Sequence, residues 1–221
     1  DLGPATATVA VSDGVGQEQR EIELAVVAPS PPPDSTPLRF TEPGSPYAIG
    51  VGDLNQDVHA DLVVSHEFQP TVSVFLGRGT GDFEPAVSYS VGRSPRAPAA
   101  VDLDRDGDLD VAVANSGDAS VSVLLGKGDG TFSPGSTYAT GTGPSGMAAA
   151  DLNRDGVLDL ITSNSESGSV SVLLGVGDGT FLARRDAPAG LQPIELAVLD
   201  SNLDGRLDVA VVNAVGGSVT S

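Results

Sequence analysis

Apolar and polar residues alternate along most of the chain in short runs, separated by glycine, proline, aspartate or asparagine. The runs "DVAVAN" at 110–115 and "VSVLLG" at 121–126 are typical, and both are rich in valine. Runs of this length with a period of two predict β-strands, whereas no window shows the 3.6-residue period of an amphipathic helix. The pattern therefore predicts an all-β chain of many short strands joined by tight turns.

The pattern repeats every 49 residues without a gap. Each unit contains an acidic segment of nine residues: "DLNQDVHAD" at 53–61, "DLDRDGDLD" at 102–110, "DLNRDGVLD" at 151–159 and "DSNLDGRLD" at 200–208, numbered loop one to loop four below. Pro46, Pro95, Pro144 and Pro193 keep the same spacing. Each unit predicts four strands, with the acidic loop between the first two. Four strands in somewhat under 50 residues are typical of a β-propeller blade, whereas the coils of the alternative, a parallel β-helix, are usually much shorter.

The repeats also predict the domain organisation. We expect an all-β propeller over 38–221 that begins with a lone outer strand at 38–42. The repeats then run at about 43–92, 93–141, 142–190 and 191–221, and the last one is truncated within its third strand. About 3.75 blades are thus expected, and because propellers have about 4–8 blades, this is a partial ring. In a complete ring the outer strand would pair with the last blade and remove the open edge.

Residues 1–27 lie outside the repeat. Two alternating segments in this range predict a β-hairpin, which we interpret as the C-terminal hairpin of an upstream Ig-like or cadherin-like domain. The Pro-rich stretch 28–37 predicts a linker. Since a detached hairpin is marginal in water, we expect this chain to be part of a larger multidomain protein.

Charge and composition exclude several classes of partner. The formal net charge is −19 and Lys127 is the only lysine, so nucleic acid is not an expected partner. No apolar run approaches the roughly 18 residues of a membrane span, so we expect no membrane insertion. The chain has no cysteine, which excludes disulfides and thiolate metal sites.

The acidic loops follow the pattern D-x-[D/N]-x-D-G-x-x-D. Positions 1, 3, 5 and 9 offer side-chain oxygens, position 7 offers a backbone carbonyl, and glycine at position 6 allows a sharp turn. A set of oxygen ligands suits Ca²⁺, whereas Zn²⁺ and Cu²⁺ are poor candidates because His59 is the only histidine in a loop. A solvated turn is the alternative, since Asp and Asn favour turns, but a turn does not need a carboxylate at position 9 four times.

We therefore predict up to four Ca²⁺ sites. The predicted side-chain ligands are Asp53, Asn55, Asp57 and Asp61; Asp102, Asp104, Asp106 and Asp110; Asp151, Asn153, Asp155 and Asp159; and Asp200, Asn202, Asp204 and Asp208. The predicted backbone ligands are the carbonyls of Asp108, Val157 and Arg206, and the side chain of Asp108 is expected to be solvated. Loop one has Val58 at position 6, where a positive φ costs a β-branched residue about 1–2 kcal/mol. We expect loop one to bind most weakly or to adopt a different turn, and loop two, with five aspartates, to bind most tightly.

Loop two, the following "VSVLLGKGDGTF" at 121–132 and their counterparts in the other units resemble the FG-GAP/VCBS repeat family, the calcium-bearing propeller blades also found in integrin α subunits. The resemblance covers about residues 36–221. It implies that each loop joins the first two strands of a blade and holds Ca²⁺ through the residues given above. It also implies a ring that commonly has seven blades.

The sequence contains no G-x-S-x-G, P-loop or H-E-x-x-H motif. We expect the carbonyl of His59, not its ring, to face an ion, and His66 to be a surface residue. Paired aspartates are also used by glycosidases, but these are better explained as metal ligands. We predict no enzymatic activity.

The predicted function is that of a calcium-stabilised interaction or adhesion module, secreted or at the cell surface. The absence of cysteine fits many exported bacterial proteins. Its partner would be an unknown protein or glycan. The extracellular location follows because extracellular calcium modules bind at about 10⁻⁴–10⁻³ M and fill only where calcium is millimolar. The alternatives are an accessory propeller of a larger secreted enzyme, with a carbohydrate-binding role, or a spacer.

Overall fold

The computed structural model describes residues 6–11, 22–27, 38–40, 45–215 and 218–220. These residues form 18 β-strands and no helix, so the predicted all-β class is confirmed. None of the described residues belongs to a helix long and apolar enough to cross a membrane.

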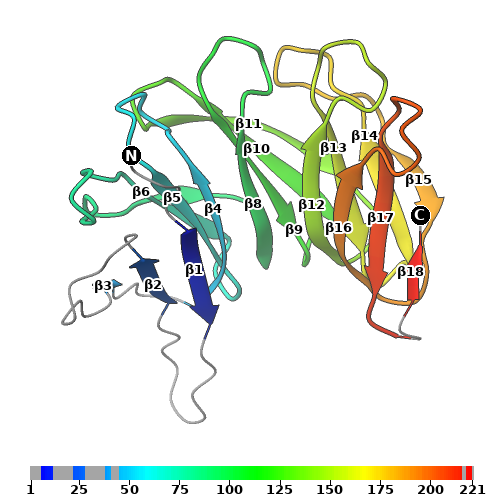
Figure 1. The fold of residues 1–221 in the computed structure, drawn as a ribbon, viewed down its shortest axis with the longest axis horizontal. Coiled ribbons are helices and arrows are strands. Elements are labelled where there is room, and N and C mark those ends of the chain that lie inside the picture. Colours follow the sequence, from blue (N-terminus) through cyan, green and yellow to red (C-terminus); the bar gives the residue numbers. More distant parts are fainter. Residues whose placement is uncertain (1–5, 12–21, 28–37, 41–44, 216–217, 221) are drawn as a thin grey trace.

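Each 49-residue unit forms one antiparallel sheet, and the four sheets stand side by side in chain order as the blades of a propeller (Figure 1). Blade one contains β4 (Pro46–Gly52), β5 (Asp61–His66), β6 (Thr71–Phe75) and β7 (Val87–Ser90). Blade two contains β8 (Pro95–Val101), β9 (Asp110–Asn115), β10 (Ser120–Gly126) and β11 (Phe132–Ala139). Blade three contains β12 (Pro144–Ala150), β13 (Asp159–Asn164), β14 (Ser169–Leu173) and β15 (Arg185–Pro188). Blade four contains β16 (Pro193–Leu199), β17 (Asp208–Asn213) and β18 (Ser218–Thr220). The predicted partial ring of four-stranded blades is confirmed.

A fifth sheet contains β1 (Thr6–Val11), β2 (Ile22–Val27) and β3 (Leu38–Phe40), in the order β1-β2-β3. β1 and β2 pair antiparallel, so the predicted hairpin is present. The predicted outer strand is also present at β3, but it is not alone, because it pairs with β2 from Leu38↔Leu24 to Ile22↔Phe40. The hairpin turn at 12–21, the linker at 28–37 and residues 41 and 42 lie outside the described residues. Closure of a complete ring by this strand stays a prediction.

The first strands of the blades all begin at a proline and all contain a register shift within their first four residues, as between Pro46 and Ala48 in β4. Proline has no N–H to give to a ladder, and a bulge near it re-aims the neighbouring side chains. These first strands are neighbours in space, β4 beside β8, β8 beside β12 and β12 beside β16. The four strand beginnings therefore converge.

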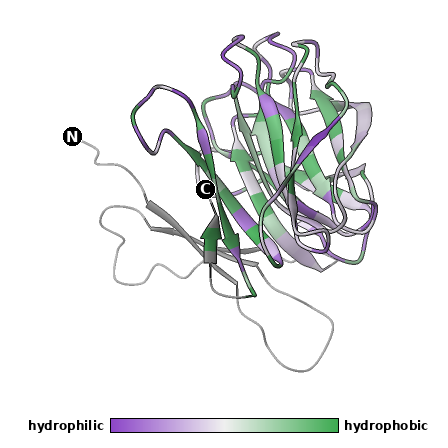
Figure 2. Ribbon diagram, turned by 90° about the vertical axis from the view of Figure 1, so that its right-hand side faces the viewer, coloured by the Kyte–Doolittle hydropathy of each residue, from purple (hydrophilic) through white to green (hydrophobic). Residues whose placement is uncertain are grey.

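The hydrophobic core lies between the blades, where valine and leucine of one sheet pack on those of the next. Hydrophobic stretches accordingly run along the strands of the blades (Figure 2). Between blades one and two, for example, Leu54 and Val63 pack with Val111 and Val113. Aromatic residues meet edge to face across two of these interfaces: Tyr89 with Phe132 at 5.3 Å between ring centroids, and Tyr138 with Phe181 at 5.1 Å. Because the first two strands of each blade are antiparallel, the acidic loops share one end of the blades and the strand beginnings share the opposite end.

Candidate metal sites in the acidic loops

All four acidic loops follow the same backbone path, with a positive φ at positions 4 and 6. At position 4 the values are 59° for Gln56, 68° for Arg105, 62° for Arg154 and 60° for Leu203. At position 6 they are 67° for Val58, 94° for Gly107, 80° for Gly156 and 80° for Gly205. Loop one therefore does not adopt a different turn. Val58 takes the left-handed conformation that glycine takes elsewhere, and its side chain is 88% exposed, so no packing offsets the strain.

Side chains at positions 1, 3 and 5 turn inward and accept hydrogen bonds from the backbone amides of the loop. In loop three the N–H of Asp155 donates to Asp151 Oδ1 at 3.1 Å and to Asn153 Oδ1 at 2.9 Å. The amides of Gly156 and Val157 donate to Asp151 Oδ2 and Asp155 Oδ1, both at 2.9 Å. Loops one and four repeat these four bonds. Positions 1, 3 and 5 therefore point their oxygens to the inside of each turn.

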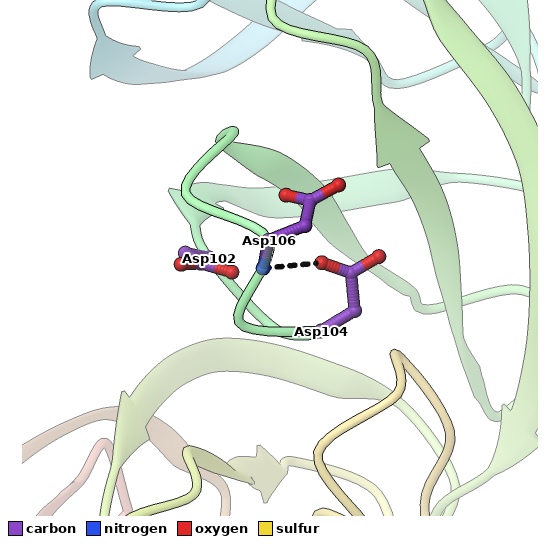
Figure 3. Close-up of side chains that lie close together, drawn as sticks. All are labelled: Asp102, Asp104 and Asp106. Atoms are coloured by element: carbon purple, nitrogen blue, oxygen red, sulfur yellow. Dashed lines mark hydrogen bonds between the residues drawn. The ribbon is translucent and has the colours of Figure 1, made fainter.

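Loop two brings three carboxylates together. One oxygen from each of Asp102, Asp104 and Asp106 lies within 4.8 Å of the others (Figure 3). The N–H of Asp106 donates to Asp104 Oδ1 at 3.2 Å. Burial raises the pKa of Asp104, and the charges of Asp106 and Asp102 raise it further. This crowding of negative charge favours a bound cation.

The other three loops have asparagine at position 3, and its amide group changes the interaction with position 5. The amide Nδ2 donates to the carboxylate at position 5 at 3.0 Å in loop one, 2.8 Å in loop three and 3.1 Å in loop four. In loop two, Asp104 is an acceptor only and cannot make this bond. Three loops thus neutralise part of the repulsion internally, and loop two does not.

The aspartate at position 9 lies beneath its loop and connects it to the third strand. Asp61, Asp110 and Asp159 are at most 1% exposed. In each, one carboxylate oxygen accepts a hydrogen bond from the backbone amide at position 2 of the loop, and the other accepts one from the amide of a glycine at or just after the end of the third strand. Asp110, for example, accepts from the amides of Leu103 and Gly126, both at 2.8 Å. Position 9 therefore has a structural role in these three blades, and contact with an ion through its remaining lone pairs stays a prediction.

Burial also shifts the acidity of these carboxylates. Burial raises the pKa of Asp110 to about 6 and also raises the pKa of Asp61. In loop four, which is exposed, a hydrogen bond from the Ser201 hydroxyl lowers the pKa of Asp208 instead.

Two residues differ from the sequence-based expectation. Asp108 is not simply solvated: it is half-buried, and its Oδ1 accepts a hydrogen bond from Gln56 Nε2 of loop one. His66 is not a surface residue: it is the last residue of β5, it is 1% exposed, and its Nε2 lies 2.9 Å from Ser73 Oγ. The other histidine, His59, lies beside the predicted ligand Asp57: its ring Nδ1 is 3.1 Å from Asp57 Oδ1.

Sequence reasoning did not identify the residues that connect each loop to its surroundings. The amide of Gly130 donates to the Leu54 carbonyl of loop one at 3.0 Å, and the amide of Gly179 donates to the Leu103 carbonyl of loop two at 3.3 Å. Both glycines belong to the "GDGT" turn of the next blade. The signal was available, because these turns keep the same 49-residue spacing as the loops.

The donor set of loop two fits Ca²⁺. It consists of carboxylate oxygens, and Ca²⁺ is a hard cation that binds 6–8 oxygen ligands. Loops one, three and four offer two carboxylates and one amide oxygen at positions 1, 3 and 5, a less charged set of the same kind.

Comparison with known proteins assigns the repeats. Residues 53–113 and 102–162 match the FG-GAP-like repeat. The resemblance to this family is thereby confirmed for the first three loops. No curated protein matches the chain.

Solved structures share the fold, as two examples show. The chain is similar to BBS1N in its complex with ARL6DN, with 15% identity and a TM-score of 0.56, over 78% of this chain and 54% of that one. It is also similar to a lectin of Agrocybe aegerita that recognises non-reducing terminal N-acetylglucosamine, with 20% identity and a TM-score of 0.57, over 98% of this chain and 65% of that one. The chain thus spans between half and two thirds of the length of these proteins, and the likeness shows the propeller fold.

Proposed function

We propose that this chain, whose repeats belong to the FG-GAP-like repeat family, is a calcium-binding, non-enzymatic interaction module of an extracellular protein. The observation that carries the proposal is the group of three converging carboxylates in loop two. Three like charges within 4.8 Å repel, and a divalent cation among them would convert that repulsion into attraction.

Asp102, Asp104 and Asp106 would hold the ion in loop two, with the Asp108 carbonyl and Asp110 as further ligands. Calcium there would supply positive charge only, and its role would be structural. Loops three and four would bind more weakly because asparagine replaces one carboxylate. Loop one would bind most weakly, because the strain at Val58 favours conformations of the free loop in which the ligand oxygens are not held together.

The extracellular assignment rests on the expected affinity. Extracellular calcium modules bind at about 10⁻⁴–10⁻³ M, a range that fills in millimolar calcium. The partner would be a protein or a glycan. Support for a glycan comes from the likeness in fold to a lectin, and support for a protein comes from the likeness to BBS1N, which was solved in a complex.

A second candidate is an accessory, carbohydrate-binding propeller of a larger secreted enzyme. The lectin-like fold favours it as much as it favours an adhesion module. A catalytic domain in the complete reading frame of the protein would decide in favour of this candidate.

Thermal unfolding of the intact protein in millimolar calcium and in a chelator tests the metal. Calcium at tenfold over its dissociation constant stabilises the folded state by about 1.4 kcal/mol per site, so we expect a higher Tm in calcium. Magnesium at the same concentration serves as the control and should raise Tm less, because Mg²⁺ prefers fewer carboxylates and more water. An unchanged Tm in calcium would refute the proposed role.

A further inference from the structure

A cavity of about 500 Å³ lies at the end of the blades opposite the acidic loops. All four blades contribute to its wall. Tyr47, Arg96, Ser145 and Ile194 each follow the proline that opens the first strand of a blade, and all four line the cavity. The repeats are alike in their acidic loops, but at this shared position they present an aromatic, a cationic, a hydroxyl and an apolar side chain.

Arg96 is held at the wall in a well-defined way. Its guanidinium lies 4.1 Å from the centre of the Tyr47 ring, and its Nη1 donates to the Tyr47 hydroxyl. Its Nη2 lies 3.6 Å from Glu67 Oε1. Its Nε, however, is buried and has no hydrogen-bond acceptor among the residues that the structure describes. A buried N–H without an acceptor is unfavourable, and a ligand oxygen that reached it would supply the missing partner.

The rest of the wall is polar but not cationic. Ser116, Ser145 and Ser165 offer hydroxyls, and the exposed Glu166 and Glu195 offer carboxylates. Ile194, 44% exposed, adds an apolar surface. Two carboxylates against one guanidinium, in a chain of net charge −19, disfavour an anionic ligand. Hydroxyls of a neutral ligand, in contrast, donate to carboxylates and accept from guanidinium and serine groups.

We infer that this cavity binds a neutral sugar residue of a glycan. The inference rests on the proposed function as an interaction module and names the ligand class and the surface that takes it. Arg96 and Ser116 would donate to sugar oxygens, and Ile194 would contact the apolar face of the ring. Glu166 and Glu195 would accept from sugar hydroxyls. The hydroxyl oxygens of Ser145 and Ser165 would also accept, since their protons already go to the carbonyls of Pro193 and Gly143. The metal loops lie at the other end of the blades, so calcium would act on this site only by keeping the blades folded.

The test uses the intact protein in calcium, on an array of neutral and acidic glycans, followed by calorimetric titration of the strongest neutral glycan. Arg96→Met and Glu195→Gln are compared with Arg184→Met. Arg184 is the matched control because it too is an ion-paired arginine, 3.2 Å from Asp186, and it does not line the cavity. We expect Arg96→Met and Glu195→Gln each to weaken binding about tenfold or more, as for a charge-assisted hydrogen bond, and Arg184→Met to leave it unchanged.

Several results would overturn the inference: no binding to any neutral glycan, binding to acidic glycans alone, binding only to a protein, or equal effects of Arg96→Met and Arg184→Met. Glu195→Gln alters an exposed side chain and keeps the test valid if Arg96→Met does not fold. The calcium-induced rise in Tm is measured on the same samples. If that rise is present and no glycan binds, the sugar site is wrong and the metal role stands; if the rise is absent, the metal role fails on its own.

Discussion

Loop two and loop three have the same backbone path, the same inward side chains and the same buried aspartate at position 9, yet they differ in how they manage charge. In loop three, Asn153 donates its amide to Asp155 at 2.8 Å. In loop two, Asp104 stands in that place beside Asp106 and cannot donate. Loop three thus offsets part of its negative charge with its own hydrogen-bond donors, whereas loop two has an excess of negative charge. The comparison separates the residues that shape the turn from those that would attract an ion.

We expect the largest effect from removing the aspartate at position 9, which tests whether this residue supports loops two and three equally. Asp110→Ala and Asp159→Ala each leave two amides without an acceptor, one buried and one half-buried, and each unsatisfied buried amide costs about 1–3 kcal/mol. We expect both variants to lose about 2–5 kcal/mol of unfolding free energy in chelator, measured by urea denaturation. Asp82→Ala, in an exposed turn, is the control and should change stability little. A clear difference between the two loops would contradict a common support.

The second largest effect we expect is a dependence of stability on pH that arises from Asp110 of loop two. Burial raises the pKa of Asp110 in the folded state to about 6, above its ordinary value of 3.8. Between these two pH values the folded state therefore binds the proton more tightly than the unfolded state does. In chelator, this contribution to stability is fully present below pH 3.8 and is lost as the pH rises through about 6. Its size is about 1–3 kcal/mol, because the full shift corresponds to about 3 kcal/mol at 1.36 kcal/mol per pKa unit and solvent screening reduces it.

Thermal unfolding at several pH values measures this dependence. Asp110→Asn should flatten the profile across that window, because the amide does not titrate. A profile with the same slope in the variant would show that other groups are responsible.

Substitutions at position 6 can introduce the backbone strain of loop one into loops two and three. Gly107→Val and Gly156→Val should each cost about 1–2 kcal/mol, because φ is positive and no atom lies within 4 Å of either added Cβ. The reverse change, Val58→Gly, should raise stability, by an amount reduced by the backbone entropy of glycine. Urea denaturation measures all three, and a neutral effect of Gly156→Val would refute the strain at this position.

Exchanging position 3 should reverse the difference between the two loops. In chelator, Asp104→Asn should stabilise the protein by about 1 kcal/mol, because the new amide can bond to Asp106. In calcium the same variant should bind the ion more weakly. Asn153→Asp in loop three should do the opposite in both conditions. Calcium titration followed by calorimetry measures these affinities, and unchanged affinities would show that position 3 does not set the binding strength.

The smallest effect concerns the contact between neighbouring loops. Gln56 of loop one reaches Asp108 of loop two, whereas loop three has Val157 at the position of Asp108. Because both side chains are partly in water, we expect a coupling of about 0.5 kcal/mol in a double-mutant cycle of Gln56→Ala and Asp108→Ala. A coupling of zero would mean that loops one and two are independent.

The sequence was sufficient for the blades and their loops because both depend on local signals. Strand alternation, turn glycines and the 49-residue spacing each reflect short-range chemistry, and all agreed. The same spacing does not reveal burial. His66 occupies the repeat position of Asn115 and Asn164, which are also buried, so its polarity suggested a surface that the third strand in fact covers.

Contacts between separate segments were the other part that could not be read from the sequence. The bond from Gln56 to Asp108 depends on how two blades are placed, and so does the convergence of Tyr47, Arg96, Ser145 and Ile194 on one cavity. The pairing of β3 with β2 likewise follows from a choice among available strand edges.

The two amides that cross the blade boundaries, from Gly130 to Leu54 and from Gly179 to Leu103, have a mechanical consequence. A tensile load that peels one blade from the next must pull directly on an acidic loop. We expect rupture to proceed in steps of one blade, and an ion that stiffens a loop to raise the force of that step. A propeller built in this way would yield gradually under a tensile load.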